Sequence, residues 1–243
     1  MKILGVIPAR WSSSRFPGKP LADICGKTMI QRVYERAKKS SLLFDVVVAT
    51  DDSRISQCVE SFGGHAIMTP SELPNGTARA EFATRIYCEA VDAVINIQGD
   101  EPLLDPRMID EVAELLSENY CVTLCSELHN DFENPNIVKV VFDSNGNALY
   151  FSRSLIPYKR NLTAQPIFQH IGIYGYSIEF LRKYVELEAT PLSEAESLEQ
   201  LKVLEHAYRI RVKVTDCKDK SIGVDTPEDL ELVKRIIQED AKI

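Results

Sequence analysis

The sequence lacks an excess of positive charge. Its 243 residues include 28 lysines and arginines against 36 aspartates and glutamates, which gives a formal net charge of -8 at pH 7. Proteins that bind nucleic acid usually present a basic face to the phosphate backbone. We therefore expect no nucleic-acid partner, and any local concentration of positive charge points instead to a small anionic ligand.

Closely spaced cysteines and long apolar runs are also absent. The six cysteines form no C-x-x-C pair and have no metal-site spacing to the four histidines. We interpret them as reduced, mostly buried thiols of a cytoplasmic protein. No stretch approaches the roughly 18 consecutive apolar residues of a membrane span, and the apolar run at the amino terminus is too short for a signal peptide. The sequence predicts a protein that is neither exported nor membrane-bound.

What is present is an alternation of strand-like and helix-like segments. Continuous apolar runs predict strands at 2–8, 45–52 and 92–102, with a shorter one at 65–69. Apolar residues at helical spacing predict helices at 28–39, 53–62, 77–91 and 106–118. Valine- and isoleucine-rich strands separated by helices are typical of an α/β fold with a mostly parallel central sheet flanked by helices. The length fits one domain spanning 1–243.

The middle third has a different pattern. Asn145-Gly146 separates two strand-like runs within 138–153, which is a hairpin signature, and a further strand-like run follows at 170–177. We therefore expect an antiparallel segment, roughly 138–190, inserted in the single domain. After it, the pattern predicts one helix at 193–206, a strand at 209–214, and a final helix capped by Thr226 and Asp229.

The first strand leads into a loop, ARWSSSRFPGKPL, that concentrates Arg10, Arg15 and Lys19. Ligands of parallel α/β sheets bind at the carboxyl ends of the strands, and loop amides with arginine and lysine can hold phosphate. The loop has neither the P-loop spacing nor the dinucleotide-binding spacing. A phosphate-binding loop is the favoured interpretation, and a solvated surface loop is the alternative.

Two acids also follow strand-like segments. Asp100 lies in QGDEP and Asp225 in GVDTPEDL, and carboxylates at such positions suit Mg²⁺. A helix-capping role fits Asp105 better than Asp100. Alternation along HIGIYGY places His170 and Tyr174 on one face of a strand, where a purely structural role is also possible.

Taken together, these stretches resemble the 3-deoxy-manno-octulosonate (KDO) cytidylyltransferases, also called CMP-KDO synthetases. The matching stretches occur in family order and cover nearly the whole chain: IPARWSSSRFPGKPL, VVVATDD, NGTARAE, VINIQGDEP, VKVVFDSNGNALYFSRSLIP, HIGIYGY, LEQLKVLE and GVDTPEDL. The resemblance implies a nucleotide-diphospho-sugar transferase-like fold. It implies transfer of CMP from CTP to the anomeric hydroxyl of KDO, with release of pyrophosphate, Mg²⁺ as cofactor, and a role in lipopolysaccharide biosynthesis. It also implies a homodimer formed through the middle β segment.

The resemblance assigns roles to individual residues. Arg10, Lys19, Asp100 and Asp225 would form the catalytic set, with Arg10 and Lys19 on the CTP phosphates and the two aspartates on Mg²⁺. The nucleotide pocket would be lined by Ala9, Asn75, Arg79 and Gln98 as well. The sugar acid would be held by Arg153, His170, Tyr174, Glu199 and Gln200, with Arg153 the candidate for its carboxylate.

One position departs from the family pattern. Ala78 stands where an acid usually follows Gly-Thr, and Glu81, one turn later, is the candidate to compensate. Two alternatives to the assigned reaction stay open at this point. The first is the same transfer to an 8-amino KDO or another sugar acid. The second is a catalytically silent CTP-binding protein. The role of Arg15 is also open.

Overall fold

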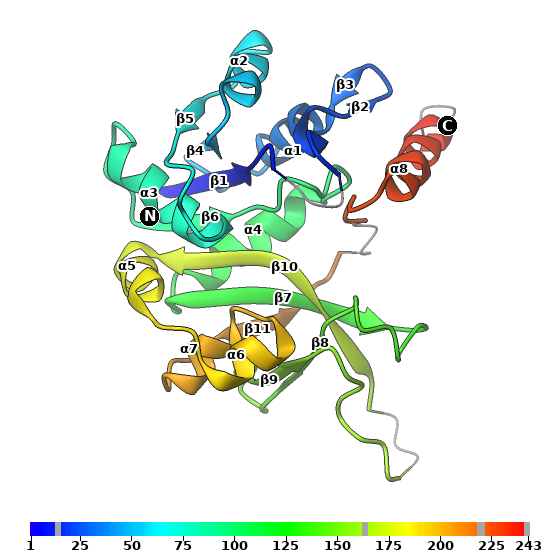
Figure 1. Cartoon of the computed structure of the whole chain (residues 1–243). Coiled ribbons are helices and arrows are strands. Elements are labelled where there is room, and N and C mark those ends of the chain that lie inside the picture. Colours follow the sequence, from blue (N-terminus) through cyan, green and yellow to red (C-terminus); the bar gives the residue numbers. More distant parts are fainter. Residues whose placement is uncertain (13–15, 162–164, 218–221, 241–243) are drawn as a thin grey trace.

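The computed structural model describes the chain except residues 13–15, 162–164, 218–221 and 241–243 (Figure 1). In the described part, nine strands form one sheet, in the order β11-β7-β10-β6-β1-β4-β5, with β8 pairing to β10 and β9 to β8. The strands span Ile3–Ala9 (β1), Asp45–Thr50 (β4), Ala66–Met68 (β5), Ala93–Asn96 (β6), Cys121–Leu128 (β7), Lys139–Phe142 (β8), Ala148–Ser152 (β9), Ile167–Ser177 (β10) and Arg211–Val214 (β11). A small separate sheet pairs β2 (Asp23–Ile24) with β3 (Lys27–Thr28).

The strands β1, β4, β5 and β6, which come from the first part of the chain, are parallel, as expected. β1 pairs in parallel with β4 and β6, and β4 pairs in parallel with β5. β7 and β11 are also parallel to each other. Parallel strands are buried on both faces, which explains the continuous apolar runs in these segments.

The antiparallel segment joins the main sheet. β8 and β9 form the hairpin expected around Asn145-Gly146. β10, however, runs antiparallel between β6 and β7 and so connects the two parallel groups of strands (Figure 1). β10 also pairs with β8 of the hairpin, and its Tyr174 lies beside Asn96, the last residue of β6.

Helices cover both faces of the sheet. Residues of α1 (Met29–Ala37), α2 (Ser53–Ser61) and α4 (Pro106–Leu115) pack with one set of alternating strand residues. Residues of α3 (Gly76–Ile86), α5 (Ile178–Glu186) and α7 (Leu201–Glu205) pack with the other set. α8 (Pro227–Asp240) packs beside β2, and its side chains form a third apolar cluster with Ile24 and Met29. Among the described residues, we find no helix with the length and apolarity needed to span a bilayer.

Two local predictions about helix starts are confirmed. The Asp105 carboxylate accepts from the amide of Arg107 and caps α4. At the start of α8, the Thr226 amide donates to the Asp229 carboxylate, and the Asp229 amide donates back to the Thr226 hydroxyl. These reciprocal bonds satisfy amide groups that have no partner within the helix.

The single helix expected at 193–206 is a wrong prediction. The structure has α6 (Pro191–Glu196) and α7, separated at Ser197, whose backbone is left-handed with φ of 51°. Leu198, Leu201 and Leu204 keep a helical spacing across the break, which is why periodicity alone favoured one helix. The break leaves main-chain carbonyls without helical partners, and the side chain of Arg153 takes two of them.

Candidate active site

Two cavities adjoin at the carboxyl ends of β1 and β6. The smaller, of about 370 Å³, lies over the loop after β1, and the larger, of about 670 Å³, lies over β10. Pro8, Arg10 and Gln98 line both cavities. Ligands in the two cavities would therefore share these three residues as neighbours.

Lys19 joins the acidic groups of the smaller cavity. Its ammonium nitrogen lies 2.7 Å from Asp100 Oδ2 and 3.2 Å from Asp225 Oδ1. The amide of Val224, next to Asp225, donates to the carbonyl of Asp100, which holds the two segments together. Two acids 125 positions apart in the sequence thus meet at one point. Ala9 and Arg10 complete the charged edge of this cavity.

Gly99 allows this convergence. A Cβ atom at Gly99 would lie 2.8 Å from the carbonyl oxygen of Pro8, a distance that side chains do not tolerate. The absence of a side chain lets the segment after β6 pass directly beside the end of β1. Asp100 and Arg10 can therefore line the same cavity from neighbouring strands.

Gln98 occupies the junction between the cavities. Its side-chain Nε2 donates to the carbonyl of Gly172 on β10, at 2.9 Å. Gly172 lies within an irregularity of the β10–β7 pairing, and a Cβ there would lie 3.4 Å from the Gln98 side chain. The bond orients the amide so that its oxygen is the atom left to accept a hydrogen bond from a ligand.

Arg153 supplies positive charge to the larger cavity. Its Nε, Nη1 and Nη2 donate to the carbonyls of Glu196, Pro135 and Ser197, at 2.8, 3.0 and 3.4 Å. All three acceptors are uncharged main-chain groups. The guanidinium is consequently held in a fixed orientation while its charge stays available for an anionic ligand.

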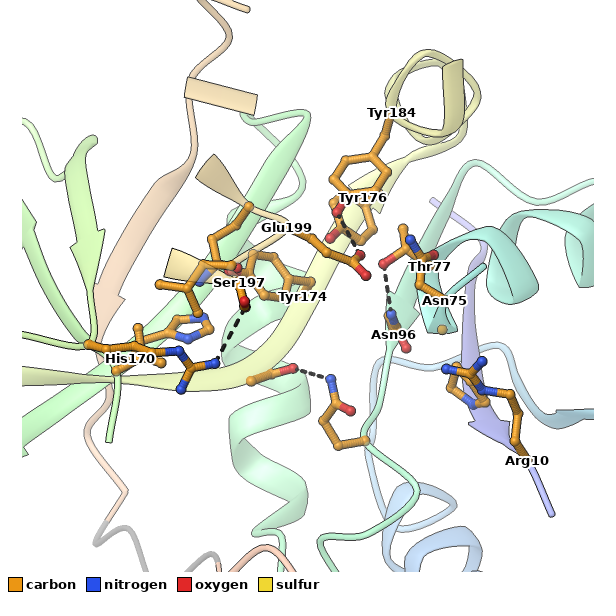
Figure 2. A pocket seen from close by; sticks show the side chains of 18 residues that line it. Arg10, Asn75, Thr77, Asn96, His170, Tyr174, Tyr176, Tyr184, Ser197 and Glu199 are labelled. Atoms are coloured by element: carbon orange, nitrogen blue, oxygen red, sulfur yellow. Dashed lines mark hydrogen bonds between the residues drawn. The ribbon is translucent and has the colours of Figure 1, made fainter. Parts of the chain in front are cut away.

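Aromatic, uncharged side chains also line the larger cavity. His170 Nε2 lies 3.1 Å from the Thr123 hydroxyl, which also contacts the carbonyls of Ile171 and Ile173. Burial lowers the pKa of His170 to about 3, so the ring is neutral near pH 7. The Tyr174 and Tyr176 rings stack with centroids 5.8 Å apart, and burial raises the pKa of each hydroxyl (Figure 2).

The break between α6 and α7 contributes the remaining polar wall. Glu199 and Gln200 line the larger cavity, as do Ser197 and Leu198. Glu199 Oε2 accepts from the Tyr184 hydroxyl at 3.4 Å (Figure 2). A continuous helix here would have presented a different set of side chains.

The larger cavity includes residues that sequence reasoning missed, among them Thr77, Asn96 and Tyr184. Asn96 Nδ2 lies 3.4 Å from the Thr77 hydroxyl, and its Oδ1 is buried with no hydrogen-bond partner among the described residues (Figure 2). The available signal was one polar residue, Asn96, in the apolar run AVINI. A buried amide oxygen without a partner is uncommon and suits a ligand hydroxyl.

Not every expected nucleotide-site residue lies in these cavities. Asn75 lines the larger one and caps α3, accepting from the amide of Ala78 at 2.8 Å. Arg79 is also expected in the nucleotide pocket, but its side chain is fully buried and lines neither cavity. It pairs with Asp51 at 2.9 Å and also donates to the Thr69 hydroxyl. The Asp51 carboxylate, which follows β4, supplies the opposite charge that a buried guanidinium needs.

Two smaller expectations concern Glu81 and Arg15. Glu81, the candidate to compensate for Ala78, is buried and accepts from Arg85 at 2.6 Å, and it lines neither cavity. Arg15 lies outside the described residues.

The described part of the chain also contains no cluster of three or more histidine, cysteine, aspartate or glutamate side chains that could hold a metal. The Asp100 and Asp225 carboxylates, which both contact Lys19, are a pair and not a cluster of three.

The chain is similar to known proteins along most of its length. A family model described as cytidylyltransferase matches residues 4–213. The chain is 50% identical to the 3-deoxy-manno-octulosonate cytidylyltransferase of Thermodesulfovibrio yellowstonii, with 98% of each chain covered. It is 44% identical to the mitochondrial 3-deoxy-manno-octulosonate cytidylyltransferase of Arabidopsis thaliana, covering 98% of this chain and 84% of the relative.

A solved structure is similar along the whole length. It is described as CMP:2-keto-3-deoxy-manno-octonic acid synthetase complexed with CTP, and it superposes with a TM-score of 0.93 at 41% identity. The match covers 99% of this chain and 100% of that one. The expected α/β fold class is confirmed by this likeness.

Proposed function

The chain belongs to the cytidylyltransferase family, and from this premise we propose that it transfers CMP from CTP to the anomeric hydroxyl of KDO, releasing pyrophosphate. The observation that carries the proposal is the pair of adjoining cavities. One holds converging cations and carboxylates, the other holds a fixed arginine, and Arg10 and Gln98 belong to both. Two anionic substrates can therefore be bound side by side.

The reaction needs positioning and charge stabilisation more than a covalent nucleophile. The sugar hydroxyl attacks the α-phosphorus of CTP in line with the departing pyrophosphate, and catalysis comes from holding the two groups in that geometry. Arg10 and Lys19 bind the phosphates and stabilise the charge that develops on the leaving group. Arg153 binds the carboxylate of the sugar acid and so fixes which hydroxyl points toward the nucleotide.

We propose Mg²⁺ as the cofactor, held by Asp100 and Asp225. The two carboxylates converge on one cation, and both are partly exposed at the cavity edge. Carboxylates are the ligands that Mg²⁺ takes in sites where phosphates complete the coordination. When bound, the ion neutralises phosphate charge and lowers the pKa of the attacking hydroxyl.

We also propose that the chain acts as a homodimer formed through the antiparallel segment. Leu149 on β9 is 62% exposed, and Tyr158, which follows that strand, is 88% exposed. Contact with a second subunit would bury such exposed apolar side chains. Light scattering would give twice the monomer mass for the wild type and a monomer for Leu149→Glu, whereas a monomeric wild type would contradict the dimer.

The cellular setting follows from the same assignment. The activated sugar would serve lipopolysaccharide biosynthesis, and we place the protein in the cytoplasm. All six cysteines are free thiols, which fits a reducing compartment.

A substrate panel tests the reaction. The protein is incubated with CTP, Mg²⁺ and one sugar acid at a time: KDO, its 8-amino analogue or a sialic acid. We expect pyrophosphate release with KDO. Turnover of the amino sugar but not KDO would move the assignment to that substrate, and CTP binding without turnover of any sugar acid would indicate a silent nucleotide-binding protein.

A further inference from the structure

A buried lysine lies behind the larger cavity. Lys139, the first residue of β8, has a fully buried side chain and lines neither cavity. Its ammonium donates three hydrogen bonds, each 2.8 Å long, to the carbonyls of Asn134, Ile137 and Arg153. An ammonium has three N–H groups, so this cage of carbonyls satisfies it completely.

A lysine is a costly residue at such a position. Burial lowers the pKa of Lys139, and the nearby carboxylates of Glu133 and Glu196 oppose that effect. An apolar side chain of similar length would avoid the cost of removing an ammonium from water. The positions of the three carbonyls indicate the role of the Lys139 charge. One carbonyl belongs to Arg153 itself, and the other two belong to a turn that contacts Arg153.

The first connection runs through a turn. The carbonyls of Asn134 and Ile137 flank Pro135, whose own carbonyl accepts from Arg153 Nη1 at 3.0 Å. By binding both sides of the turn, Lys139 fixes the direction of the Pro135 carbonyl. That carbonyl is one of the three groups that orient the guanidinium.

The second connection is direct. Lys139 binds the main-chain carbonyl of Arg153, while the carboxylate of Glu196 accepts from the Arg153 amide at 2.9 Å and the Ser152 hydroxyl at 2.6 Å. Both main-chain polar groups of Arg153 are therefore bound by charged side chains of opposite sign. This arrangement restrains the backbone from which the guanidinium extends.

We propose that Lys139 is a positioning residue for the sugar acid: it fixes the turn at 134–137 and the backbone of Arg153, and so holds the guanidinium ready for the substrate carboxylate. The inference rests on the proposed function, in which Arg153 binds that carboxylate. It assigns Lys139 no contact with substrate.

The test is a double-mutant cycle on steady-state kinetics. Lys139→Met removes the three donors at similar side-chain length. We expect KM for KDO to rise about tenfold or more, because charge-assisted hydrogen bonds that orient Arg153 are lost, while KM for CTP stays within about twofold. In an Arg153→Met background, Lys139→Met should change KM for KDO no further, since its effect passes through Arg153.

A control and a second variant keep the outcomes distinct. Lys183→Met removes an exposed lysine paired with Glu179 and should leave both KM values unchanged. Asn134→Ala removes the side-chain acceptor for the Asn136 amide in the same turn, without touching the buried ammonium. We expect it to raise KM for KDO about threefold, and it decides the question if Lys139→Met does not fold.

The results separate the inference from the function it rests on. An unchanged KM for KDO in folded Lys139→Met, or equal losses with and without Arg153, would overturn the positioning role while wild-type turnover stands. For a misfolded Lys139→Met, an unchanged KM in Asn134→Ala would overturn it. A wild-type protein that turns over no sugar acid would overturn the proposed function, and the positioning role with it.

Discussion

Replacing Lys19 by methionine removes the cation that joins the two acids of the smaller cavity. Its ammonium lies 2.7 Å from Asp100 and 3.2 Å from Asp225, and among the described residues Arg10 is the other cation lining this cavity. The two positive and two negative side chains cancel formally. Without Lys19 these described side chains have a net negative charge before Mg²⁺ binds, and the triphosphate of CTP must approach them.

The size of the effect follows from burial and distance. The Lys19 side chain is 13% exposed, so its contacts are screened less than those of a surface pair. Two unit charges 4 Å apart interact by about 4 kcal/mol at an effective dielectric constant of about 20, and the exposure of Asp225 reduces this. Loss of one preorganised donor at a site of developing charge typically costs about 10²–10³ in rate. We expect that range for the fall in kcat/KM for CTP.

The assay is pyrophosphate release at saturating KDO, with calorimetry for CTP affinity. Lys27→Met is the matched control, because Lys27 pairs with Glu35 on the surface close to the same loop. It should leave kcat/KM unchanged. Lys19→Met that stays folded and loses less than about threefold would refute the assignment of Lys19 to the phosphates.

Three further predictions concern stability. Gly99→Ala should destabilise the fold by about 1–3 kcal/mol in urea unfolding, because the new Cβ meets the Pro8 carbonyl; an unchanged midpoint would contradict the close approach. Arg79→Met should cost about 3–5 kcal/mol, since it leaves Asp51 without its buried partner; a loss below about 1 kcal/mol would contradict that pairing. The pKa of His170 is lowered to about 3, so between pH 6.5 and 3 the unfolded chain binds a proton that the folded chain does not. The contribution of His170 to the free energy of unfolding is therefore complete above pH 6.5. It decreases by at most about 1.4 kcal/mol per pH unit as the pH falls. Wild type and His170→Gln should differ in this slope, and identical slopes would contradict a neutral His170 ring in the folded state.

The sequence patterns predicted the strands and the helix caps, because these features depend on neighbouring residues. Each apolar run became a strand because burial on both faces demands it, and the cap of Thr226 and Asp229 formed because both partners lie within one turn. The convergence of Asp100 and Asp225 could be predicted from two sources. One is the rule that ligands bind at the carboxyl ends of strands, and the other is the family resemblance.

The errors arose where a distant partner changed a local preference. Nothing near Arg79 in the sequence indicates that Asp51, beyond another strand and helix, would hold it below the surface. The leucine spacing after Ser197 favours a continuous helix, and only the arrival of Arg153 from β9 explains how the broken helix satisfies its carbonyls. Lys139 is a charged residue at the start of a strand, and its burial depends on a cage of carbonyls that only the fold assembles.

The most direct test of the central claim is identification of the product by mass spectrometry and ³¹P NMR after the protein is incubated with CTP, Mg²⁺ and KDO. The two-cavity arrangement predicts CMP joined to KDO through a phosphodiester at the anomeric position, formed in equal amount with pyrophosphate and abolished by Arg153→Met at sugar concentrations near the wild-type KM. Pyrophosphate formed with free CMP alone, or product formation that does not depend on Arg153, would contradict a sugar acid bound in the larger cavity.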